Sequence, residues 1–135
     1  MVLDTNVIYA ALRSNRGASY ALLNAAVNGQ FEIALSVALC LEYEDVAFRE
    51  PSPLPPDDIT AILDQLVAIS IHPAIRFQWR PQLRDPKDEM VLETAINGQC
   101  SHIVTFNTRD FAGCERFSLT VLTPTEFLAQ LGGKP

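Results

Sequence analysis

The sequence lacks any apolar run long enough to span a bilayer, which excludes a transmembrane helix. It also lacks the basic and apolar leader that marks export, so we expect a cytoplasmic protein. Cysteine is scarce, and the spacing of the three residues present matches neither a zinc site nor a disulfide framework; they are Cys40, Cys100 and Cys114. Free thiols in a reducing compartment are therefore expected.

Positive charge is also scarce. Ten Lys and Arg residues stand against sixteen Asp and Glu residues, and the net charge of −6 disfavours a surface that coats nucleic acid broadly. An acidic enzyme site that holds divalent cations is compatible with this charge. One basic segment stands out, with two aromatic residues inside it: Arg76, Phe77, Trp79, Arg80, Arg84 and Lys87. This segment is either a strip that contacts RNA phosphates or a solvated loop.

What the sequence does contain is enough apolar residues for a core, since 48% of its 135 residues are hydrophobic. This length predicts a single domain over residues 1–135. Strand-like segments alternate with segments of helical periodicity, which predicts a parallel sheet with helices on both faces. The expected strands cover residues 2–3, 31–35, 67–71, 102–106 and 119–122. The expected helices cover residues 7–12, 18–28, 37–49, 57–66 and 86–97, with a short last helix ending at residue 131.

The chain is organised around its opening stretch, Val2-Leu-Asp-Thr-Asn-Val7. Asp4 stands where a buried strand gives way to a helix, which Thr5 or Asn6 can cap. In open α/β sheets, ligands bind at the carboxyl ends of the strands. A carboxylate there is costly unless it is paired or holds a metal. The alternative is that Asp4 only forms an Asx-turn between strand and helix.

Three more polar residues are expected at the same edge of the sheet. Asn107 directly follows the strand expected over residues 102–106, and Glu42 flanks the apolar face of the helix over residues 37–49. Asp88 is three and four residues before an apolar pair, so it heads the buried face of its helix. Asp85 is instead expected to be the N-cap of that helix.

Three carboxylates and an amide on one edge would repel one another without a cation. Oxygen ligands of this kind suit Mg²⁺ or Mn²⁺, which polarise a phosphoryl group and activate water. We therefore expect Asp4, Glu42 and Asp88 to hold the metal, and Asn107 to support it or orient a water. Each residue also has a simpler reading. Asn107 can initiate a turn, Glu42 can be a surface residue, and Asp88 can favour the helix dipole.

These residues carry a resemblance to the PIN-domain ribonucleases, close to the bacterial PIN toxins of toxin–antitoxin systems. The opening stretch, with Asp4 as its acid, resembles the first motif of that family. Ser36 followed by Leu41-Glu42-Tyr43 resembles the second motif, with Glu42 as the acid. The first motif is fairly specific, whereas the second is weak alone. Related chains usually carry a few more residues before the first strand.

The third and fourth motifs lie in the second half of the chain. Asp88, followed by Val91-Leu92 and Thr94-Ala95, resembles the third motif. Ile103-Val-Thr-Phe-Asn107, followed by Thr108-Arg-Asp-Phe111, resembles the more specific fourth motif. The fourth position is often Asp in the family, and here it is Asn107. The resemblance spans nearly the whole chain.

The resemblance implies a three-layer α/β/α fold with a parallel sheet of four to five strands in the order 3-2-1-4-5. It implies Mg²⁺- or Mn²⁺-dependent cleavage of single-stranded or structured RNA, and a homodimer. In toxin systems it also implies a small antitoxin protein that blocks the site. The expected activity is therefore that of an endoribonuclease, acting as the toxin of such a system.

Three alternatives stand beside this interpretation. A catalytically inactive PIN scaffold that binds only RNA or protein gains weight from Asn107, which leaves three acids. A haloacid-dehalogenase-type phosphatase requires a second Asp two residues after the first, where this sequence has Asn6. A response-regulator receiver requires a Lys at a later strand end. No Lys occurs between Lys87 and Lys134, and neither of those two follows a strand.

Overall fold

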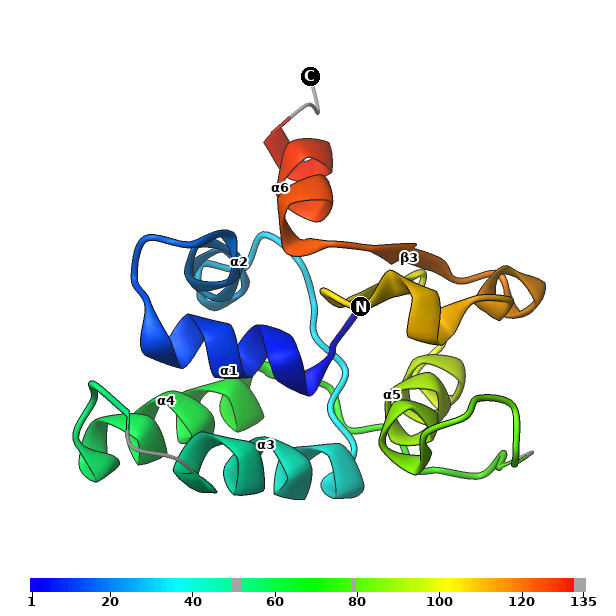
Figure 1. The fold of residues 1–135 in the computed structure, drawn as a ribbon, viewed down its shortest axis with the longest axis horizontal. Coiled ribbons are helices and arrows are strands. Elements are labelled where there is room, and N and C mark those ends of the chain that lie inside the picture. The colour runs from blue at the N-terminus through cyan, green and yellow to red at the C-terminus, as the bar shows by residue number, and fades with distance from the viewer. Residues whose placement is uncertain (50–51, 79, 133–135) are drawn as a thin grey trace.

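The computed structural model describes residues 1–49, 52–78 and 80–132. The helices are α1 (Thr5–Arg13), α2 (Ala18–Val27), α3 (Val37–Arg49), α4 (Pro56–Ile69), α5 (Pro86–Asn97) and α6 (Pro124–Gly132), with short 3₁₀ helices η1 (Thr108–Phe111) and η2 (Cys114–Phe117). The strands are β1 (Val2–Leu3), β2 (His102–Val104) and β3 (Thr120–Leu122). Figure 1 shows α6 above the strands and α5 below them. In the described residues, every helix is too short or too polar to cross a membrane.

The strands form a parallel sheet in which β2 lies between β1 and β3. Backbone hydrogen bonds continue this sheet beyond β1. The Ala34 N–H donates to the Met1 carbonyl at 2.9 Å, and Ala34 also forms a parallel bridge with Ile71. If β1, the segment at Ala34, the segment at Ile71, β2 and β3 are numbered one to five along the chain, their order across the sheet is 3-2-1-4-5. The expected α/β fold and its strand order are therefore confirmed.

Several predicted boundaries are wrong. Residues 67–69 form the last turn of α4 instead of a strand, because the apolar spacing of Ile59, Leu63 and Leu66 continues as helix up to the C-cap Ser70. The strand expected over residues 31–35 is reduced to the bridge at Ala34. Helix α1 starts at Thr5, before the expected start, because Asp4 itself is the N-cap.

Apart from the partly buried His102 at the start of β2, the residues of the two central strands are completely buried, as is usual when helices cover both faces of a parallel sheet. Val2, Leu3, Ile103 and Val104 each have an exposed fraction of 0%. Helix α5 packs against β1 and β2, and α1 packs between α2 and α3. The carboxyl ends of β1 and β2 are therefore held in place by the core.

Two side chains attach α3 to its neighbours. Ser36 caps α3, since its Oγ accepts the Leu39 N–H at 3.2 Å, and it also lies 2.8 Å from the Thr94 hydroxyl of α5. The buried Tyr43 donates its hydroxyl to the Leu3 carbonyl of β1. Burial, followed by the charge of Asp4, raises the pKa of Tyr43 well above its usual range, so the phenol remains a donor. These bonds fix the helix that carries Glu42.

Replacing Tyr43 with Phe should lower the free energy of unfolding by about 1–3 kcal/mol, because it removes a buried hydrogen bond. Tyr20 provides a matched control, since its side chain is exposed on α2. Tyr20→Phe should change the free energy by no more than about 0.5 kcal/mol. Urea unfolding of both variants measures the difference. Equal midpoints for Tyr43→Phe and the parent chain would contradict the anchoring role.

Candidate active site

Asp4 lies at the carboxyl end of β1 with an exposed fraction of 6%. Its Oδ1 accepts the Thr5 backbone N–H at 2.7 Å and the Thr5 hydroxyl at 3.2 Å. Its Oδ2 accepts the Thr105 hydroxyl at 2.7 Å. Burial raises the pKa of Asp4 more than these hydrogen bonds lower it. The carboxylate is therefore held firmly, at a cost that a nearby cation would offset.

Thr105 joins the ends of β1 and β2, and sequence reasoning missed it. Besides donating to Asp4, its hydroxyl oxygen accepts the Asn107 backbone N–H at 3.0 Å and the Asn6 side-chain amide at 3.3 Å. The Asn6 amide oxygen in turn accepts the Phe106 N–H at 3.4 Å. Thr105 thus positions both Asp4 and the loop that carries Asn107.

The start of α5 brings a second acid to this edge. Asp85 is the N-cap, as predicted, and its carboxylate accepts the Lys87 N–H at 2.9 Å. Asp88 lies one turn further and is partly buried. Burial, followed by the charges of Asp4 and Asp110, raises the pKa of Asp88 from 3.8 to about 7. Asp88 thus lies within electrostatic range of Asp4.

Asp110 is the acid that sequence reasoning left out of the site. It lies on η1, and its charge raises the pKa of both Asp4 and Asp88. Asn107, which the sequence assigns to the site, stands at the start of the same short helix and is exposed. The only available signal was that Asp110 lies within the fourth motif. Nothing in the sequence distinguished Asp110, three residues after Asn107, as a member of the site.

Glu42 forms an ion pair with Lys87, which lies at the start of α5. Its Oε1 lies 3.3 Å from the Lys87 ammonium, and the exposed fraction of the Glu42 side chain is 13%. Lys87 offsets the charge of Glu42, and the pair joins α3 to the helix turn that carries Asp88. The low exposure of its side chain shows that Glu42 does not lie on the outer surface of α3.

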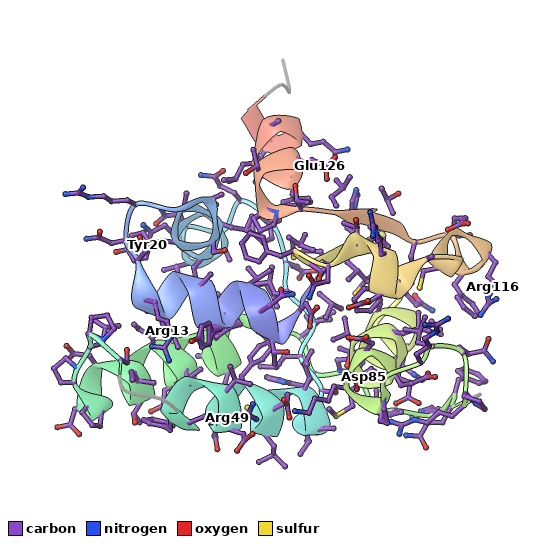
Figure 2. The ribbon with its side chains drawn as sticks, viewed as in Figure 1. Arg13, Tyr20, Arg49, Asp85, Arg116 and Glu126 are labelled. Carbon is purple, nitrogen blue, oxygen red and sulfur yellow. The ribbon has the colours of Figure 1, made fainter. Side chains whose placement is uncertain are left out.

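Two open hollows adjoin the site and share Arg109 and Asp110. The larger, of about 600 Å³, is lined by Gln82, Leu83, Arg84, Asp85, Asp88, Arg109, Asp110 and Ala112. The smaller, of about 450 Å³, is lined by Phe106, Asn107, Thr108, Arg109 and Asp110. Asp85 and Arg116 mark this end of the molecule in Figure 2, opposite the end that carries Arg13 and Tyr20. The acids and arginines that line these hollows suit a ligand that combines a divalent cation with a phosphate group.

The predicted basic strip has divided roles. Arg80 makes two 2.7 Å hydrogen bonds to the nearly buried Glu93, which fixes the loop before α5. The Arg76 backbone N–H is held by Asn97 at 2.8 Å. Arg84 borders the larger hollow. Trp79 lies outside the described residues. Of the described residues of this strip, Arg84 lines the larger hollow and Lys87 pairs with Glu42, whereas Arg80 is engaged by Glu93.

The donor set fits a hard divalent cation. Asp4, Glu42, Asp88 and Asp110 offer carboxylate oxygens, and burial, followed by the charges of Asp4 and Asp110, raises the pKa of Asp88. Within residues 1–49, 52–78 and 80–132, no three Asp, Glu, His or Cys side chains already form a group that could hold an ion.

The raised pKa of Asp88, caused by burial and then by the charges of Asp4 and Asp110, predicts a stability difference between two variants. Asp88 has a pKa of about 7 when folded and an ordinary value near 3.8 when unfolded. Its contribution to metal-free stability is therefore fully present below about pH 4 and is lost as the pH rises to about 7. Asp88→Asn should remove this loss and gain stability over the parent chain between those values.

The control variant replaces Asp85, the N-cap of the same helix. Asp85→Ala should lower the free energy of unfolding by about 0.5–2 kcal/mol at neutral pH, because the Lys87 N–H loses its acceptor. Urea unfolding in the presence of a chelator, at several pH values, measures both variants. A difference between Asp88→Asn and the parent that stays constant with pH would contradict the raised pKa of Asp88.

The site can now be compared with known proteins. A family model described as "PIN domain" matches residues 1–109, a range that contains Asp4, Glu42, Asp88 and Asn107. None of the curated proteins compared with the sequence matches it. PIN domains are in general nucleases that act on RNA and use divalent metals. Because the match covers well over half of the chain, this protein belongs to the PIN domain family.

Proposed function

We propose that this protein is a metal-dependent endoribonuclease that hydrolyses RNA phosphodiester bonds. The observation that carries the proposal is the hollow lined by Asp85, Asp88 and Asp110, in which burial, followed by the charges of Asp4 and Asp110, raises the pKa of Asp88 to about 7. Asp4, Glu42 and Asp88 are the proposed ligands of Mg²⁺ or Mn²⁺, with Asp110 beside them. Asn107 supports the metal or orients a water. General nuclease function in the family supports this assignment.

The protein fixes the Asp4 carboxylate in position before a metal binds. Asp4 accepts three hydrogen bonds, two from Thr5 and one from Thr105, which leaves about one of its four acceptor positions for a cation. When bound, a divalent ion supplies positive charge to a phosphoryl group and lowers the pKa of a water. Arg84 and Arg109 border the same hollow and are placed to hold the phosphate backbone.

Metal binding by Glu42 requires that this residue exchange its partner Lys87 for the metal ion. In the structure the Lys87 ammonium offsets the charge of Glu42. For Glu42 to become a ligand, the cation must replace Lys87 beside its carboxylate. Lys87 would then be available to an RNA phosphate, together with Arg76, Arg80 and Arg84. Because Arg80 is bound to Glu93, its replacement should disturb the loop as well as RNA binding.

The Lys87–Glu42 ion pair also favours a second candidate, a catalytically inactive PIN scaffold that binds RNA or protein. A lysine already offsets one of the three predicted ligands, and Asn107 replaces the fourth acid. The two candidates differ in one measurable property, since only the nuclease cleaves RNA when metal is added.

The first test is metal-dependent cleavage. Mg²⁺ or Mn²⁺ should raise the thermal midpoint of the parent chain by mass action and should start cleavage of single-stranded RNA. Asp88→Asn should fall to background cleavage, whereas Asp85→Ala should keep most of its activity at a temperature where it is folded. Gel analysis of a labelled RNA measures cleavage. Metal-independent stability together with intact RNA would favour the inactive scaffold.

We further propose that the protein is a toxin of a toxin–antitoxin system, acts as a homodimer and is inhibited by a small antitoxin. The resemblance of the first and fourth motifs to PIN toxins supports this part. Induced expression in bacteria should arrest growth, because RNA would be cleaved in the cell. Expression of Asp88→Asn at the same level should not. Equal growth curves for the two would remove the toxin role and leave the nuclease proposal standing.

A further inference from the structure

Phe106 is an exposed aromatic residue that closely follows a buried strand. It follows β2, in which Ile103 and Val104 are completely buried, yet 48% of Phe106 is exposed. Its side chain lines the smaller hollow of about 450 Å³, together with Asn107, Thr108, Arg109 and Asp110. The core does not account for this placement, because about half of the residue is exposed and it lines a hollow that also contains Asp110.

The loop that presents Phe106 is fixed by hydrogen bonds. The Phe106 N–H donates to the Asn6 side chain at 3.4 Å, and the Asn107 N–H donates to the Thr105 hydroxyl at 3.0 Å. The Asp110 N–H donates to the Asn107 carbonyl at 3.0 Å. An aromatic ring on a fixed backbone loses little conformational entropy when a flat ligand stacks on it.

The chemistry of the lining selects one class of ligand. An exposed ring stacks on any nucleobase, a guanidinium binds phosphate or stacks on the base, and a side-chain amide bonds to a base edge. Phe106, Arg109 and Asn107 provide these three groups in that order within one hollow. The hollow shares Arg109 and Asp110 with the acidic hollow, so an RNA strand bound at the acids would continue into it.

We propose that Phe106 and Arg109 form a nucleotide subsite that stacks one unpaired base and holds its phosphate next to the acids. This inference rests on the proposed function, because it takes RNA as the substrate. It favours single-stranded RNA, since a base inside a duplex has no free face for the ring. Stacking matters here because the net charge of −6 weakens non-specific attraction to RNA.

The experiment compares two single-stranded probes in the presence of a chelator, so that no metal is bound. One is a fluorescein-labelled RNA oligonucleotide, and the other is an abasic sugar–phosphate chain of the same length. Phe106→Ala should weaken binding of the RNA about fivefold to a hundredfold and leave binding of the abasic chain unchanged. Phe106→Trp should keep RNA binding. Arg109→Ala should weaken both probes and lower the salt slope by about one.

Phe48 supplies the matched control. Its exposed fraction of 47% equals that of Phe106 within one per cent, and it lies on α3 outside both hollows. Phe48→Ala should bind both probes like the parent chain. Circular dichroism verifies that each variant is folded. The subsite is refuted if Phe106→Ala binds RNA like the parent, if Phe48→Ala weakens binding equally, or if the parent binds no RNA.

Cleavage with Mn²⁺ separates this inference from the proposed function. If the parent chain cleaves RNA and Phe106→Ala binds and cleaves equally well, the subsite is wrong and the nuclease stands. If no cleavage occurs but RNA binding depends on Phe106, the nuclease is wrong and the subsite belongs to an RNA-binding scaffold. Binding of a protein partner that is lost in Phe106→Ala, with RNA binding unchanged, would reassign the hollow to protein contact.

Discussion

Keeping the Asp4 carboxylate out of water, at the end of a fully buried strand, is the constraint on which the rest of the structure depends. A buried carboxylate is costly, and three donated hydrogen bonds hold it in place. Two of the donors are on Thr5, which begins α1, and the third is on Thr105, which follows β2. The parallel pairing of β1 with β2 brings these donors together, so the sheet order and the site are consequences of one arrangement.

Local rules made the central part of the site predictable. The cap at Asp85 and the inward position of Asp88 follow from residue spacing within one helix, and the strand order agrees with the family resemblance. The sequence did not reveal Asp110, because a short 3₁₀ turn returns it to the acids and such a turn has no apolar periodicity. It also did not reveal the pairing of Glu42 with Lys87, which joins two helices far apart in the chain.

The loop before α5 shows that a cluster of basic residues in a sequence can have a structural role. Glu89 is buried because it accepts the backbone N–H groups of Gln82 and Leu83 at 2.6 and 2.7 Å. Glu93 is buried because it binds Arg80. These two acids shape the loop around α5 and occupy one of its arginines. Basic residues near each other in a sequence can therefore serve the fold before they serve a ligand.

The Thr105 hydroxyl has a consequence for how the site responds to a ligand. A hydroxyl has one proton and two lone pairs, and here all three are engaged: the proton by Asp4, the lone pairs by Asn6 and by the Asn107 backbone. No rotation of this group preserves all three bonds. The loop after β2 and the Asp4 carboxylate are therefore coupled through Thr105, so that a displacement of the loop would break at least one of these hydrogen bonds.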